Sequence, residues 1–188
     1  MPMKKSVYRL PCMVSVCVLL FLTSGCGADY NIYELYQVTD NEDFTFDYVI
    51  KDKNDNVLLF EERISREPEI NVINENLLSV SVQAGTGLST RWTIYCDVLN
   101  GNVSDAYCSV LGEYEENVVY VNYDNGTYRI VIQNIFNQKL FYKETVLEDA
   151  SLAADPVVGF EIGDNDTAKV VYLKGEDYLE TEITLDLN

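Results

Sequence analysis

The side chains in this sequence that could do covalent chemistry are its five cysteines, at positions 12, 17, 26, 96 and 108. Histidine is absent from all 188 residues. Without an imidazole, the chain has no Ser-His or Cys-His nucleophilic system, and it lacks the commonest metal ligand. Carboxylates are abundant, with 31 Asp and Glu against 13 Lys and Arg. The chemistry to consider is therefore that of a thiol or of paired carboxylates.

Cys26 follows a segment with three parts. The first part is basic and contains Lys4, Lys5 and Arg9. The second, residues 13–22 (MVSVCVLLFL), is an apolar run, and the third places Ser24 and Gly25 before the cysteine. This order is typical of a secretory signal peptide. The apolar run is about half of the ~20 residues that span a bilayer, so it does not predict a transmembrane helix.

The residues Leu22, Ser24, Gly25 and Cys26 resemble a bacterial lipobox, the motif at which a cysteine is lipidated and the signal peptide removed. Thr23 departs from the motif, since an aliphatic residue usually stands there. The alternative is an ordinary signal peptide in which Cys26 is incidental. The resemblance implies a diacylglyceryl thioether on Cys26, and two acyl chains anchor a protein stably. We therefore expect an extracytoplasmic protein, lipid-anchored to the bacterial cell membrane.

This interpretation divides the chain into a signal peptide at 1–25, a lipid anchor and tether at 26–43, and a single β domain at 44–188. The formal net charge of −18 becomes more negative when the basic signal peptide is removed. Nucleic acid is excluded as a partner, because its binding depends on Lys and Arg. Most of the acidic residues are expected to form a solvated surface.

Short apolar runs alternate with Asn, Asp and Gly from residue 44 onward, and the 14 tyrosines favour strands. The predicted fold is an all-β antiparallel meander of about 10–12 strands, sandwich-like. The predicted strands are 44–51, 56–64, 70–74, 77–83, 91–98, 103–110, 117–123, 127–136, 139–147, 157–162, 167–174 and 178–187. The last is the clearest, because apolar residues alternate with Glu180, Glu182, Thr184 and Asp186.

A faint repeat relates four predicted hairpins, at 48–64, 93–110, 129–146 and 169–186, which begin about 40 residues apart. A period near 40 is also that of propeller blades. A partial β-propeller-like arrangement is therefore the alternative fold. The chain lacks the usual blade signatures and is short for a closed propeller, so the sandwich-like meander is preferred.

Three further groups of residues have a structural and a chemical interpretation. Cys96 and Cys108 are predicted to be buried free thiols, because a register that pairs Cys96 with Ala106 sets the two cysteines diagonally, at about 7–8 Å between Cα atoms. The acidic stretches 52–56 and 164–167 lack the glycine and glutamate of a calcium loop and predict hairpin turns. We expect no metal and no cofactor.

Residues 63–87 (RISREPEINVINENLLSVSVQAGTG) and 172–187 (YLKGEDYLETEITLDL) are similar to a group of small uncharacterised bacterial surface lipoproteins. This resemblance carries no catalytic motif. The expected function is therefore that of a non-catalytic binding or adaptor module, which engages a protein or glycan at the cell surface. The alternatives are a carbohydrate- or cell-wall-acting hydrolase with two carboxylates about 5–9.5 Å apart, and an envelope assembly factor.

Overall fold

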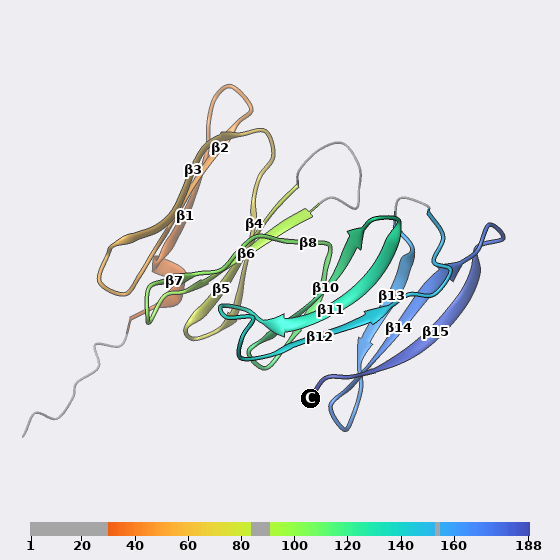
Figure 1. Ribbon diagram of the computed structural model, residues 1–188. Helices are drawn as coiled ribbons and strands as arrows, with labels where there is room; N and C mark the ends of the chain where they lie inside the picture. The colour runs from red at the N-terminus through yellow and green to blue at the C-terminus, as the bar shows by residue number, and fades with distance from the viewer. Residues whose placement is uncertain (1–29, 84–90, 153–154) are drawn as a thin grey trace, which may run out of the picture.

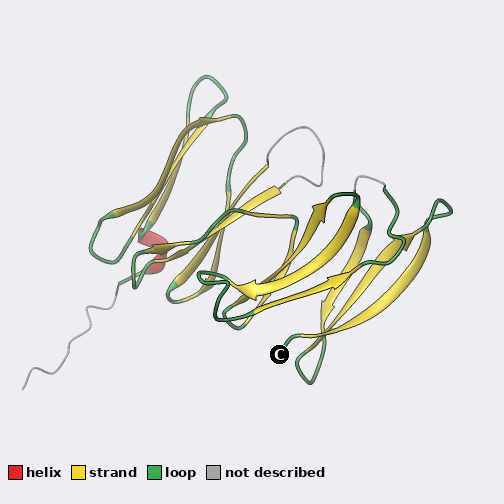
Figure 2. Cartoon of the chain, viewed as in Figure 1, coloured by secondary structure: helices red, strands yellow, loops and turns green. Residues whose placement is uncertain are grey.

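The computed structural model describes residues 30–83, 91–152 and 155–188, which form an all-β protein (Figures 1 and 2). One 3-10 turn, η1 (Ile32–Glu34), precedes the first strand. No helix in these ranges is long and apolar enough to cross a membrane. The strands are β1 (Tyr36–Asp40), β2 (Phe46–Lys51), β3 (Val57–Ile64), β4 (Glu69–Asn74), β5 (Leu77–Gln83), β6 (Arg91–Asp97), β7 (Asn102–Val103), β8 (Tyr107–Cys108), β9 (Val110–Tyr114), β10 (Asn117–Asp124), β11 (Thr127–Asn134), β12 (Tyr142–Val146), β13 (Val157–Ile162), β14 (Thr167–Lys174) and β15 (Leu179–Asp186).

The strands form four antiparallel sheets that follow one another along the chain and across Figure 1. Sheet 1 has the order β1-β2-β3, and sheet 2 has the order β4-β5-β6-β7, with β8 also paired to β6. Sheet 3 has the order β12-β11-β10-β9, and sheet 4 has the order β13-β14-β15. Each of the four repeated hairpins predicted from sequence falls in a different sheet, apart from Val110 at the end of the second, which belongs to β9 of sheet 3. The repeat therefore corresponds to one sheet per unit.

Apolar clusters lie between consecutive sheets, so the sheets pack face to face in a stack. Between sheets 1 and 2, with η1, lie Ile32, Tyr48, Ile50, Leu78, Val80, Cys96 and Val98. Between sheets 2 and 3 lie Leu77, Tyr95, Tyr107, Val118 and Ile135. Between sheets 3 and 4 lie Val119, Val121, Ile130, Ile132, Leu147, Ala168, Val170, Tyr172, Leu185 and Leu187. The predicted meander and its sandwich-like packing are confirmed, with the two-layer packing repeated along the stack.

Burial along the strands follows from this order. In β5 the five residues Leu77–Ser81 are all buried, because sheet 2 has a neighbour on both faces. Sheet 4 ends the stack, so β15 alternates: Leu185 is buried, while Glu180, Glu182 and Asp186 are exposed. The predicted apolar and acidic faces of the last strand are confirmed, although Leu179 is exposed at its start.

The first strand lies in the segment assigned to the tether. Tyr36 and Val38 of β1 pair with Ile50 and Tyr48 of β2 and pack against the cluster between sheets 1 and 2. Tyr30, Tyr33 and Tyr36 are three residues apart, which is also a helical spacing, so the sequence did not distinguish this short strand from a helix. Sheet 1 therefore begins before residue 44.

The predicted strand 103–110 is divided among three elements. Residues 107–108 pair with β6 in sheet 2, whereas 110–114 pair with β10 in sheet 3. The chain crosses between the sheets at Ser109, which has φ 51°, donates its backbone N–H to Arg91 O and accepts from Val121 N. A single continuous strand could not serve both sheets.

Candidate binding cleft

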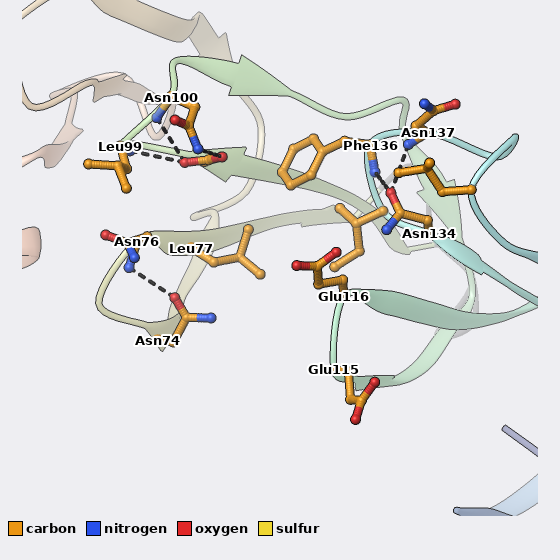
Figure 3. Close-up of a pocket in the computed structure, with 13 residues that line it drawn as sticks. Asn74, Asn76, Leu77, Leu99, Asn100, Glu115, Glu116, Asn134, Phe136 and Asn137 are labelled. Atoms are coloured by element: carbon orange, nitrogen blue, oxygen red, sulfur yellow. Dashed lines mark hydrogen bonds between the residues drawn. The ribbon is translucent and has the colours of Figure 1, made fainter. Parts of the chain in front are cut away.

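Hairpin turns from sheets 2 and 3 enclose a cleft of about 380 Å³ along one side of the stack, between its two middle sheets (Figure 3). They are the β4–β5, β6–β7 and β9–β10 turns and the β11–β12 loop. This volume is within the ~300–1,000 Å³ range of small-molecule sites. The lining residues are Asn74, Asn76, Leu77, Asp97, Leu99, Asn100, Glu115, Glu116, Asn134, Ile135, Phe136, Asn137 and Leu140.

Three of these turns are held by an Asn or Asp side chain at their first position. Asn74 Oδ1 accepts the backbone N–H of Asn76 at 2.9 Å. Asp97 Oδ1 accepts those of Leu99 and Asn100, at 3.0 and 2.9 Å. Asn134 Oδ1 accepts those of Phe136 and Asn137, at 3.2 and 3.0 Å. Asn and Asp favour such turns because their short side chains satisfy the backbone two residues ahead.

The turn hydrogen bonds fix the orientation of the amide groups. A backbone N–H can only donate, so the accepting atom of Asn74 and of Asn134 must be the oxygen, and the other atom is the NH₂ group. The hydrogen bonds of the described residues include none from either Nδ2. The cleft therefore has one oriented amide donor group from sheet 2 and one from sheet 3.

The carboxylates of the cleft differ in their availability. Asp97 is occupied by its turn, since its Oδ2 also accepts Asn100 Nδ2 at 2.7 Å. Glu115 and Glu116 form the exposed β9–β10 turn. Figure 3 shows the carboxylate of Glu116 pointing into the cleft and that of Glu115 pointing away from it. One carboxylate is therefore positioned to accept a hydrogen bond from a ligand.

An apolar surface faces these polar groups. Phe136 is 38% exposed and Leu140 is 70% exposed, while Leu77 and Ile135 are buried behind them. The Phe136 ring points into the cleft in Figure 3. The residues that line the cleft include no Lys or Arg. The surface thus offers a ligand amide hydrogen-bond donors, a carboxylate acceptor and an aromatic ring.

The residue predicted from sequence to carry the lipid is not among those that the structure describes. Cys26 and the signal peptide lie outside the described residues. Tyr30, the first described residue, donates its hydroxyl to Asn76 Oδ1 at 2.5 Å and to Glu75 O at 3.2 Å. The described chain therefore begins beside the cleft, at a residue hydrogen-bonded to one of its lining side chains.

Cys96 and Cys108 are free thiols, as predicted. Cys96 is buried, and burial raises the pKa of its thiol to about 12, whereas Cys108 is only half-buried. The predicted register is wrong: Cys96 pairs with Val103, and Cys108 with Trp92. The turn is the reason: Asp97 Oδ1 accepts the backbone N–H groups of Leu99 and Asn100, and Gly101 N donates to Asp97 O, so the loop spans 98–101 and Asp97 pairs with Asn102.

The acidic stretches form hairpin turns, as predicted. Asp52 accepts the backbone N–H groups of Asn54 and Asn56 and the side-chain amide of Asn56. The Asn56 side chain beside it, together with the backbone N–H groups, holds the pKa of Asp52 below its usual value. No group of three or more Cys, Asp or Glu that could hold a metal ion occurs within the described ranges.

Sequence reasoning missed the cleft, although the breaks between predicted strands at 75–76 and 99–102 fall in two of its turns. Residues 134–136 were assigned to a strand that ends instead at Asn134. The signal that could have found the site is an Asn or Asp at the first position of each turn, together with the apolar Phe136 and Leu140. Comparisons with family models, curated proteins and solved structures found no match to this chain.

Proposed function

We propose that the protein is a non-catalytic binding module, lipid-anchored through Cys26 at the extracytoplasmic face of a bacterial membrane. The cleft between sheets 2 and 3 is its ligand-binding surface. The single observation that supports this most is the combination, in one cleft, of oriented amide donors with an exposed aromatic ring. Such convergence of polar groups on an apolar pocket is typical of ligand sites.

The position of the anchor suggests where the ligand is met. Cys26 precedes Tyr30 by four residues, and four residues span at most about 14 Å. Tyr30 is hydrogen-bonded to Asn76 of the cleft. A lipid on Cys26 would therefore hold the cleft close to the membrane surface. The ligand is then a component that extends to this surface.

The cleft has only one available carboxylate, which favours ligand binding over hydrolysis by two carboxylates. Glycosidases require two carboxylates flanking the scissile bond. In the cleft, Asp97 already accepts three hydrogen bonds and Glu115 points away, which leaves Glu116. A Glu116→Gln variant should accordingly keep ligand binding within about threefold, while loss of a measurable hydrolytic activity in this variant would support the enzyme instead.

The anchor is tested by fractionating cells that express the full chain or its Cys26→Ser variant. The full chain should sediment with membranes, whereas the variant should not, because it lacks both acyl chains. Cys108→Ser serves as the control, since it removes a different thiol and leaves the anchor in place. Retention of Cys26→Ser in the membrane fraction would refute the lipid anchor.

The cleft is tested by photo-cross-linking in the native host with p-benzoylphenylalanine at Leu140. This position is exposed beside the cleft, and Phe44, which is 89% exposed and outside it, provides the matched control. A discrete adduct from position 140 and none from position 44 would support the proposal. Equal labelling, or none at position 140, would contradict it. A recurring protein adduct would favour the envelope assembly function.

A further inference from the structure

We propose that the cleft between sheets 2 and 3 binds a neutral carbohydrate. This inference rests on the proposed function, because it requires the cleft to be a ligand site, and it adds the chemical class of the ligand. It is carried by four features of the cleft: the oriented amide groups, the single inward carboxylate, the aromatic ring and the lack of basic lining residues.

The amide groups match an uncharged acceptor. Asn74 and Asn134 line the cleft and use their oxygens in turns, so the NH₂ group of each is left for a ligand. Asn134 is nearly buried, which holds its amide in place. Ordered donors of this kind bind hydroxyl or carbonyl oxygens with little loss of side-chain entropy. A sugar hydroxyl accepts from such a donor and can donate its own proton to Glu116.

Charge argues against an anionic ligand. Phosphate, sulfate and carboxylate groups are bound in proteins by Arg and Lys, and the cleft is lined by neither. The formal net charge of −18 also repels anions from the whole molecule. A phosphorylated or uronic-acid-rich ligand is therefore disfavoured.

Hydrogen-bond polarity argues against a basic peptide. Lys and Arg side chains carry only donors, and they would meet the fixed NH₂ groups of Asn74 and Asn134. Asp97 is less available to such a side chain than a free carboxylate, because its oxygens already accept three hydrogen bonds from its own turn. A hydroxyl, which both donates and accepts, satisfies the amides and Glu116 with a single group.

The Phe136 ring completes the match. Its exposed face has the negative potential of an aromatic quadrupole, which attracts the weakly positive C–H groups of a pyranose face. Leu140 extends the apolar surface beside it. A sugar ring is apolar on its faces and polar around its edge, so it contacts Phe136 and the amide groups at the same time.

The test screens the full lipid-modified chain, purified in detergent, against an array of neutral oligosaccharides that includes N-acetylglucosamine, glucose and mannose oligomers. A parallel array carries Lys- and Arg-rich peptides. We expect binding to at least one neutral oligosaccharide, with an affinity that changes less than twofold between about 50 and 500 mM NaCl, because no ion pair is formed.

Two variants locate the binding. Phe136→Ala should weaken it at least tenfold, with Phe44→Ala as the matched control. Asn74→Asp keeps the oxygen that accepts Asn76 N but removes the NH₂ donors, and it should also weaken binding. Asn54→Asp adds the same charge in another turn and should have no effect. Circular dichroism of every variant should match that of the unmodified chain.

Three results would overturn the carbohydrate proposal. They are an array with no neutral oligosaccharide bound, binding that survives both Phe136→Ala and Asn74→Asp, and a preference for basic peptides that weakens with salt. If position 140 still gives a discrete adduct in cells that is not a recurring protein, the binding module stands and only the ligand class falls. If neither experiment gives a signal, both proposals fall together.

Discussion

At the scale of single residues, the interior between sheets 2 and 3 depends on hydroxyl groups. Tyr107 donates to Ile135 O at 2.6 Å and accepts Gln133 Nε2 at 3.1 Å. Tyr107→Phe leaves both partners buried without this hydroxyl, so it should lower the free energy of unfolding by about 1–2 kcal/mol. Urea unfolding followed by circular dichroism measures the change.

Tyr48 provides the contrast for this prediction. Its side chain is 1% exposed, and its hydroxyl is the only buried side-chain polar atom of the described residues with no hydrogen-bond partner. Tyr48→Phe removes a group that is desolvated without compensation and should cost less than about 0.5 kcal/mol, or stabilise the fold. A loss as large as that of Tyr107→Phe would show that the Tyr48 hydroxyl is satisfied in solution.

A carboxylate at the end of sheet 4 gives a pH dependence. Tyr114 of β9 donates its hydroxyl to Asp166 Oδ1, and Asn188 Nδ2 donates to Oδ2 at 2.9 Å. These two bonds, that of Tyr114 first, hold the pKa of Asp166 below its usual value. Because folding lowers the pKa of this carboxylate, its ionised form adds to the free energy of unfolding at pH values above the unfolded-state pKa of about 3.9. This contribution is lost as the pH falls through the folded-state pKa.

Tyr114→Phe removes the larger cause of this shift. Its melting temperature should lie below that of the unmodified chain at pH 7. The difference should shrink as the pH falls below about 4, and it should vanish once the pH is below the depressed folded-state pKa, where Asp166 is protonated in both proteins. Thermal melts at several pH values measure this, with exposed Tyr33→Phe as the control. A difference that stays constant down to pH about 2 would exclude the ionised Asp166 as its source.

At the scale of elements, sheets 3 and 4 meet where β9 lacks a side chain. A Cβ at Gly112 would lie 2.8 Å from Phe160 Cε1 of β13, closer than carbon atoms approach. Gly112→Ala should therefore push the two sheets apart and lower the free energy of unfolding by about 1–3 kcal/mol. At Gly163 the nearest atom is Thr167 Oγ1 at 3.4 Å, so Gly163→Ala is a milder control. Equal stabilities would contradict this packing.

The elements are also where sequence reasoning succeeds or stops. The turn Asn125–Gly126 was predictable because both residues must have positive φ, and they have φ 50° and 80°. The crossing at Ser109 was not, because it depends on hydrogen bonds to Arg91 and Val121, which come from two different sheets. Local pattern specifies hairpins, whereas contacts between sheets decide where a strand is divided.

The cleft could not be predicted for the same reason. Asn74 and Asn134 are turn residues by local chemistry, but their amides come together only because sheets 2 and 3 pack face to face. No spacing within the sequence encodes this approach. The lipidation of Cys26 has the opposite character, because it is predicted entirely from the local order of residues, and it stays a prediction that the fractionation experiment decides.

At the scale of the whole molecule, negative charge opposes the compact state. The formal net charge is −18. The outer face of sheet 4 has Glu161, Glu180, Glu182 and Asp186, of which Glu182 is paired with Lys169 at 2.6 Å and Asp186 with Lys143 of β12 at 2.9 Å. Repulsion among exposed charges is screened within a Debye length of about 10 Å at 0.1 M salt. The melting temperature should therefore rise as NaCl increases from about 20 to 300 mM.

Neutralising one of these charges tests the origin of the salt effect. Glu180 is exposed on the outer face and lies opposite Leu173 of β14. Glu180→Gln should raise the melting temperature at low salt, and the gain should disappear at about 300 mM NaCl, because salt already screens the repulsion that the substitution removes. A gain that persists at high salt would arise from strand propensity or packing. A melting temperature that falls with salt would mean that the attraction in pairs such as Lys169–Glu182 outweighs the net repulsion.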